Sequence, residues 1–212
     1  GDEGVLALMA DSTNAATPGF TKSESSVTEA LDRAFTGAKG RILLATFASN
    51  VSRIQQAVDV AGRHRRKIAI VGRSMINVAN IAMDLGYLKV PEGQIIDVDE
   101  IHRYPSDQIL ILTTGSQGEP MAGLSRMSRR EHRKIQIQYG DRVIFSATPI
   151  PGNEKSVSKT IDSLLRLGAE VVHERSAGIH VSGHARQEDL RLIMSLVRPK
   201  YLIPVHGEYH ML

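Results

Sequence analysis

The sequence predicts an α/β fold, with a largely parallel, twisted sheet that is covered by helices on both faces. Apolar runs of strand length alternate with segments of helical period, and the runs themselves show little polar alternation. Strands without alternation are typical of a sheet that is buried on both faces. Strand–helix alternation favours right-handed crossovers between parallel strands. A length of 212 residues, with 42% hydrophobic and 23% charged residues, is that of a globular protein.

The expected elements follow in order along the chain. Apolar runs predict strands at residues 5–9, 42–47, 68–71, 109–113, 143–146, 171–173 and 201–205, with a further short run that ends near Val181. Apolar residues spaced by three and four predict helices from residue 51, from about residue 75 to Gly86, across 157–165 and across 190–197. Thr21 and Glu24 have the spacing of a capping box, which predicts a helix start at this point.

Composition excludes several classes of protein. The absence of cysteine removes disulfide scaffolds, thiolate zinc sites and cysteine nucleophiles. Aromatic residues make up only 4% of the chain and tryptophan is absent, which disfavours a base-stacking surface for single strands. No apolar run approaches the roughly 18 residues of a membrane helix. We therefore expect a cytoplasmic protein without membrane contact, and the net charge of +3 is compatible with an acidic partner.

Polar residues follow the predicted strands, at the sheet edge where ligands of α/β proteins bind. These segments are residues 11–14, 49–50, 114–120, 149–154, 182–185 and 206–208. Each is also compatible with ordinary turn and cap chemistry. Gly115 and Gly118 are closely spaced in the sequence, and glycines so spaced allow the backbone amides of their loop to approach a phosphate. The glycine patterns of Walker loops and dinucleotide-binding turns are absent, which disfavours a nucleotide-dependent oxidoreductase.

Two histidine pairs have a spacing of four, His180 with His184 and His206 with His210. On a helix this spacing forms a zinc site, but the glycines inside both pairs argue against a helix there.

A different arrangement of histidines is favoured. One predicted helix and one predicted strand separate His184 from His206, so both imidazoles are expected at strand ends on the same side of a sheet. Imidazole acts as a general acid near neutral pH and as a metal ligand when neutral. Together with Asp11 at another strand end, these side chains predict a hydrolytic site. The alternative is a pair of hydrogen-bonded loop histidines.

A cluster of basic residues has two possible interpretations. It is either a solvated face or a surface that binds the phosphates along a nucleic acid, and binding of the latter kind weakens as salt increases. Its members are Arg126, Arg129, Arg130, Arg133 and Lys134.

Five motifs strongly resemble the bacterial ribonuclease J family, which is the RNA-processing branch of the β-CASP metallo-β-lactamase hydrolases. They are residues 47–50, 114–120, 149–154, 180–185 and 204–209. In that family a β-CASP domain is inserted into a metallo-β-lactamase domain of αββα architecture. The resemblance therefore implies a flanking metallo-β-lactamase segment at residues 1–22, a β-CASP domain at 23–185 and a return into the metallo-β-lactamase domain, with edge strands only, at 186–212.

The resemblance also implies roles for individual residues. His184 is the general acid that protonates the leaving oxygen, Asp11 orients it, and His206 binds one of two zinc ions at which water is activated. The implied substrate-binding residues are Ser182, Gly183, Ala185, Ser49, Asn50, Gly115 and Ser116. His210 stands where similar sequences are expected to carry arginine.

The implied function is that of a zinc-dependent ribonuclease in RNA maturation and decay, which cuts RNA internally and degrades it from the 5′ end. Its partners are RNA, the remainder of the metallo-β-lactamase domain and further copies of the enzyme. The family's other metal ligands, a His-x-His-x-Asp-His run with a further His and Asp, are absent from this sequence. We therefore expect the 212 residues alone to be inactive and to bind zinc poorly. The competing hypothesis is a non-catalytic RNA-binding or protein-docking module of the same fold, although such a module needs none of Asp11, His184 and His206.

Overall fold

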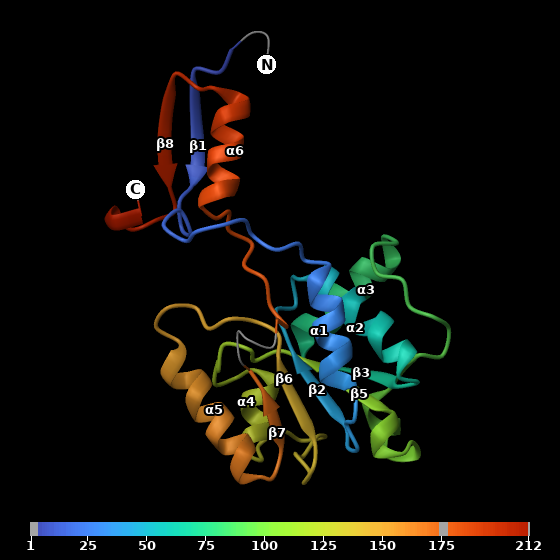
Figure 1. Cartoon of the computed structure of the whole chain (residues 1–212). Helices are drawn as coiled ribbons and strands as arrows, with labels where there is room; N and C mark the ends of the chain where they lie inside the picture. Colours follow the sequence, from blue (N-terminus) through green and yellow to red (C-terminus); the bar gives the residue numbers. More distant parts are fainter. Residues whose placement is uncertain (1–3, 174–177, 212) are drawn as a thin grey trace. The chain divides into compact units, whose positions relative to one another are not determined.

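Figure 1 presents the computed structural model of the chain, which describes residues 4–173 and 178–211. The chain forms two compact units. The large unit is Ser25–His180, and the small unit combines Gly1–Glu24 with Val181–Leu212. The assignment of residues 1–22 and 186–212 to a metallo-β-lactamase domain stays a prediction.

The large unit is built on a six-stranded sheet in the order β4-β3-β5-β2-β6-β7, in which every pair of neighbours is parallel. The central strands β2 (Ile42–Ala45) and β5 (Ile109–Thr113) are buried along their whole length. The outer strands are β3 (Lys67–Val71), β4 (Ile95–Ile96), β6 (Arg142–Phe145) and β7 (Glu170–Val172). This arrangement confirms the predicted parallel α/β fold.

Helices cover both faces of this sheet because the chain leaves its centre in opposite directions. From β2 it runs through α2 (Val51–Arg63) and α3 (Arg73–Asp84) towards β4. From β5 it runs through α4 (Gly123–Ser128) and α5 (Glu154–Arg166) towards β7. Right-handed crossovers then place these two pairs of helices on opposite faces, and α1 (Ser26–Phe35) packs with α2 (Figure 1). Two short 3₁₀ helices, η1 (Val98–Arg103) and η2 (Ser106–Gln108), lead into β5.

The small unit pairs the two ends of the chain. Strand β1 (Ala7–Asp11) runs parallel to β8 (Tyr201–Val205), and α6 (Gln187–Val197) precedes β8. A 3₁₀ turn, η4 (Tyr209–Met211), follows β8. The register sets Asp11 opposite Val205, so the carboxyl ends of both strands coincide. Among the described residues, every helix is too short or too polar to span a bilayer.

Two expectations for local structure are wrong. The helix predicted at Thr21 begins at Ser26, because the Thr21 amide donates to Asp189 Oδ2 (2.8 Å) and the Thr21 hydroxyl to the His184 carbonyl (2.9 Å). The described part of the apolar run that ends near Val181, residues 178–181, forms no strand. Its chain continues as a loop to an isolated bridge between Arg186 and Asn14.

Candidate active site in the small unit

Asp11 and His206 lie at the adjoining carboxyl ends of two parallel strands. Asp11 is the last residue of β1, and His206 directly follows Val205, the last residue of β8. The strand ends are joined further by Ser12, whose amide and hydroxyl both donate to the Val205 carbonyl, at 2.9 Å and 2.8 Å. Parallel pairing therefore brings together two polar residues from opposite ends of the chain.

The backbone of His206 is held in a left-handed conformation, with φ of 58°. This conformation is unfavourable for a residue with a side chain and persists where its surroundings enforce it. Thr13 supplies one such contact, because its hydroxyl donates to the His206 carbonyl at 2.6 Å. A Cβ at the next residue, Gly207, would lie 2.4 Å from Ser12 Oγ and would displace the hydroxyl that donates to the Val205 carbonyl.

His184 reaches the same place from a loop and not from a strand end, which corrects the prediction. The loop is fixed by side chains on the segment that follows β1. Asn14 Nδ2 donates to Ser182 Oγ (3.0 Å), and the Thr21 hydroxyl donates to the His184 carbonyl (2.9 Å). Ser182 Oγ also accepts the His184 amide at 3.2 Å, which closes a local turn before the imidazole.

One carboxylate oxygen holds both imidazoles. Asp11 Oδ2 lies 2.9 Å from His184 Nδ1 and 3.0 Å from His206 Nδ1, and the ring centroids are 5.3 Å apart. Since a carboxylate oxygen accepts, each Nδ1 carries the proton and donates it. The structure thus brings Asp11, His184 and His206 together, as the sequence predicts, and it does so within a single unit.

The charge on Asp11 is strongly stabilised. Burial alone would raise the pKa of its carboxyl group, but this effect is outweighed by hydrogen bonds from the Thr13 amide, from His184 and from His206. The pKa of Asp11 therefore lies well below its ordinary value.

The donor set is compatible with a zinc ligand at His206. Ligand atoms of Asp11, His184 and His206 all lie within 4.8 Å of one another. Histidines that bind metals usually donate their second ring nitrogen to a carboxylate, which fixes the tautomer. His206 has this arrangement through Nδ1, which leaves Nε2 as its ligand atom. Both oxygens of Asp11 already accept hydrogen bonds, because Oδ1 takes the Thr13 amide at 2.9 Å, so an orienting role suits this residue better than ligation.

The other predicted residues of this loop differ in their surroundings. Ser182 is engaged by Asn14, as described above. Gly183 is exposed, and a Cβ there would meet nothing within 4 Å, so its backbone is open to a ligand. Ala185 is half-buried. His210, on η4, lies 3.5 Å from Glu208 Oε2 at the surface.

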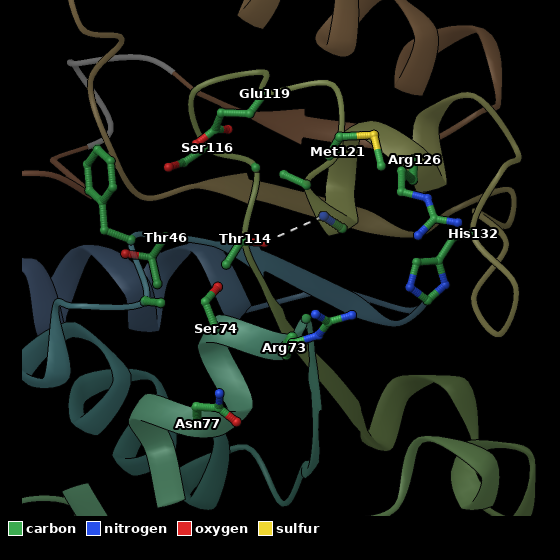
Figure 2. A pocket seen from close by; sticks show the side chains of 16 residues that line it. Thr46, Arg73, Ser74, Asn77, Thr114, Ser116, Glu119, Met121, Arg126 and His132 are labelled. Carbon is green, nitrogen blue, oxygen red and sulfur yellow. Dashed lines mark hydrogen bonds between the residues drawn. The ribbon is translucent and has the colours of Figure 1, made fainter. Parts of the chain in front are cut away.

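Gly115 and Ser116 line a separate pocket in the large unit, with a volume of about 780 Å³ (Figure 2). It lies at the carboxyl ends of β2, β3 and β5, where crossovers depart towards opposite faces of the sheet. This is the position at which open α/β sheets bind ligands. Its lining includes Thr46, Gly72, Arg73, Ser74, Thr114, Arg126 and His132.

The pocket contains cations and a hydroxyl group that lacks a partner. Figure 2 shows the guanidinium groups of Arg73 and Arg126 gathered with the His132 ring at one side. Thr46 Oγ1 is buried and has no hydrogen-bond partner among the described residues. Glu119 also lines the pocket, where its carboxylate accepts the Gln117 amide at 3.2 Å. Such a lining suits an anion.

Ser49 and Asn50 lie outside the lining of this pocket. Ser49 is exposed. Asn50 caps α2, because its Oδ1 accepts the Arg53 amide at 3.0 Å, and this cap is the ordinary role that its position before an apolar helix suggests.

Sequence reasoning missed several residues that organise these sites. Thr13 and Thr21 hold His206 and His184, but hydroxyl groups in turns carry no distinctive pattern. Gln117 is buried, donates to the Thr148 carbonyl (2.9 Å) and accepts the Ile150 amide (2.7 Å), which joins the 115–120 and 147–153 loops. The one available signal for Gln117 was its place between two glycines.

Comparisons with known proteins agree with the predicted family. A family model described as "Ribonuclease J, beta-CASP domain" matches residues 39–164, and one described as "Zn-dependent metallo-hydrolase RNA specificity domain" matches residues 168–212. The chain is 51% identical over its whole length to Ribonuclease J of Synechocystis sp., of which it covers 33%. It is 45% identical to Ribonuclease J2 of Bacillus subtilis, in a match that includes 100% of this chain and 38% of the relative. It is 48% identical to Ribonuclease J of Mycolicibacterium smegmatis, in a match that includes 99% of this chain and 38% of the relative. The chain thus spans 33–38% of the length of these relatives.

Proposed function

The chain belongs to the ribonuclease J family, and we propose that it supplies part of the active site of a zinc-dependent ribonuclease in its full-length protein. The observation that carries this proposal is the contact of Asp11 Oδ2 with two imidazoles, at 2.9 Å and 3.0 Å. A non-catalytic RNA-binding module requires no such arrangement. RNA as substrate and zinc as metal are supported by the descriptions of the matching family models.

The proposed reaction is hydrolysis of an RNA phosphodiester. A new bond forms between phosphorus and the oxygen of water, which releases a proton to the solvent, and the bond between phosphorus and the leaving oxygen breaks. His184 gives the proton of Nε2 to the leaving oxygen, while Asp11 Oδ2 accepts a hydrogen bond from Nδ1 and so orients the ring. A positioned general acid of this kind contributes about 100- to 10,000-fold to a rate.

His206 is the proposed zinc ligand in this chain. Zinc, when bound, supplies a Lewis acid for the phosphodiester and lowers the pKa of a coordinated water molecule. A complete site with two ions needs further ligands from the remainder of the metallo-β-lactamase domain. The 212-residue chain alone is therefore expected to be inactive.

RNA is proposed to contact both units. The backbone of residues 182–185 holds the phosphate next to His184, and Gly115 and Ser116 bind RNA phosphate through the pocket of the large unit. This assignment is supported by the pocket's cations and by the Thr46 hydroxyl, which has no partner among the residues that the structure describes. Ser49 and Asn50 are assigned to RNA on the resemblance alone. The balance of cleavage within the chain and from its 5′ end, homo-oligomerisation and a cytoplasmic location stay predictions.

The apolar surface of the small unit is proposed to pack against the rest of the metallo-β-lactamase domain. Its exposed side chains are Leu6, Met9, Leu192, Leu196, Tyr201 and Leu202. The relatives have about three times the length of this chain, which leaves ample sequence to cover them.

Zinc content tests the proposed ligand. Full-length protein with His206→Ala is expected to lose bound zinc and RNA cleavage. The matched control is His64→Ala, because His64 also lies beside a carboxylate, 3.1 Å from Asp32, but in the large unit. Full zinc content and wild-type cleavage in the His206→Ala protein would overturn the proposal.

A further inference from the structure

A buried arginine of the large unit donates hydrogen bonds to the chain shortly before the loop that carries His184. Arg53, on α2, is 0% exposed. Its Nη1 donates to the carbonyl groups of Ile179 (2.7 Å) and Ser146 (3.1 Å), and also to the Ser146 hydroxyl group. Its Nε donates to Gln56 Oε1 at 3.0 Å. The guanidinium thus joins a helix, the end of β6 and the segment that returns to the small unit.

The Ile179 carbonyl is held twice. The Ser146 hydroxyl donates to it at 2.7 Å, in addition to Arg53. Ser146 and Ile179 are 1% and 2% exposed, so these hydrogen bonds lie in a medium of low dielectric, where a charged donor is especially effective. Removing either donor leaves the Ile179 carbonyl with a single hydrogen bond to hold it.

The segment held in this way has little regular structure of its own. Between β7, which ends at Val172, and α6, which begins at Gln187, the described residues form no strand or helix and contain only the bridge at Arg186. Backbone ladders therefore do not fix residues 178–185, and individual hydrogen bonds must do so. Ile179 precedes His184 by five positions in this segment.

We propose that Arg53 is a positioning residue of the enzyme. Together with Ser146 it anchors the Ile179 carbonyl and thereby restricts the segment that carries Ser182 and His184. This inference rests on the proposed function, because it assigns to the anchor the task of keeping His184 in the geometry of the general acid. Small displacements of such a group lower a rate about 100-fold without any loss of binding contacts.

The same unit offers a matched control in Arg66. This arginine is 4% exposed and also donates to backbone carbonyls, those of Ala38 (2.8 Å), Ile109 (2.9 Å) and Gly40 (3.0 Å). These carbonyls lie where β2 and β5 begin, at the opposite end of the sheet from Ser146. Loss of Arg66 removes a comparable set of buried hydrogen bonds without touching the returning segment.

The test measures single-turnover RNA cleavage and RNA affinity of the full-length protein. Arg53→Met and Ser146→Ala are expected to slow cleavage about 10- to 100-fold while the Kd for RNA changes less than about twofold. Arg66→Met is expected to lose stability but to cleave at the wild-type rate. If Arg53→Met fails to fold, Ser146→Ala still removes one donor to Ile179 and retains the guanidinium.

Wild-type cleavage by Ser146→Ala and Arg53→Met, or an equal loss of rate in Arg66→Met, would overturn the anchor. His184→Ala in the same assay separates this failure from that of the proposed function. An inactive His184→Ala protein beside fully active anchor variants refutes the anchor alone, whereas an active His184→Ala protein refutes the proposed function.

Discussion

Asp11 Oδ2 lies 2.9 Å from His184 Nδ1, although 173 positions separate the two residues. The contact joins the last residue of β1 to the loop that carries His184. Hydrogen bonds from Asn14 and Thr21, which follow β1, hold this loop in place. Both residues belong to the small unit, so the pair depends on the folding of the two chain ends together.

Asp11→Asn is expected to slow RNA cleavage by the full-length protein about 100-fold, because the variant loses the carboxylate that orients the His184 imidazole through Nδ1. The side chain of asparagine has only one oxygen atom. Its NH₂ group would therefore face at least one of the three groups that donate hydrogen bonds to Asp11. RNA affinity is expected to change little. The rate and the Kd are measured separately, and Asp32→Asn, beside His64, serves as the control. Equal rates for the two variants would contradict the assignment of Asp11.

Gly118→Ala is expected to destabilise the large unit by about 3 kcal/mol or more. Gly118 has φ of 70°, and a Cβ there would lie 2.5 Å from the Ser156 carbonyl carbon in α5. The control is Gly86→Ala, with a similar φ of 74° but nothing within 4 Å, for which the expected cost is about 1 kcal/mol. Urea unfolding of the 212-residue chain measures both. A cost at Gly118 no greater than that at Gly86 would show that the close contact with α5 is unimportant.

The sequence predicts the sheet well because its strands are buried on both faces and therefore uniformly apolar. The runs at 109–113 and 201–205 coincide with β5 and β8. The two-residue β4 and the six-residue α4 are too short to show periodicity, and both were missed. The error at Thr21 has a different origin, since a hydroxyl that resembles a helix cap donates instead to a carbonyl in a distant segment.

For the candidate site, the residue types and the parallel strand ends predict that Asp11 and His206 meet. The route by which His184 reaches them was not predictable, because it depends on single hydrogen bonds of Asn14 and Thr21. The backbone strain at His206 has no counterpart in the sequence pattern.

His132 predicts a dependence of stability on pH. Burial lowers the pKa of its imidazole below the ordinary 6.5, and Arg126 lowers it further. Its Nδ1 also accepts the amides of Ile135 (3.0 Å) and Lys134 (3.3 Å), which a protonated ring does not do. As pH falls below 6.5, the unfolded chain binds the proton first, so the free energy of unfolding decreases until pH passes the folded pKa.

His132→Asn provides the comparison for this measurement, since its side-chain oxygen retains an acceptor that does not titrate in this range. Unfolding free energies of both chains are measured between about pH 4 and pH 8, around the ordinary histidine pKa. The wild-type chain is expected to lose more stability on acidification than the variant. Parallel pH profiles would exclude His132 as the source.

The basic cluster after α4 is expected to contribute to RNA binding. Charge reversal at Arg129 and Arg130 weakens binding at low salt and leaves the cleaved position unchanged. Arg130→Glu has the larger effect, because the Arg129 guanidinium is already engaged by Glu131 (2.8 Å) and by the Pro120 carbonyl (2.7 Å). For a single strand, each lost phosphate contact reduces the slope of log K against log salt by about 0.7.

Binding isotherms across a salt series measure this effect in the full-length protein. Arg166→Glu is the control, because Arg166 is an exposed cation at the end of α5, outside the cluster. A cluster that is only a solvated face would give the same salt slope in all the variants.

The most direct test of the account is single-turnover RNA cleavage by the full-length protein with His184→Ala, beside His64→Ala as control. We predict a loss of at least about 100-fold in rate for His184→Ala, an unchanged Kd for RNA and wild-type behaviour of the control. Cleavage by His184→Ala at the wild-type rate would contradict the claim that Asp11, His184 and His206 form the catalytic site.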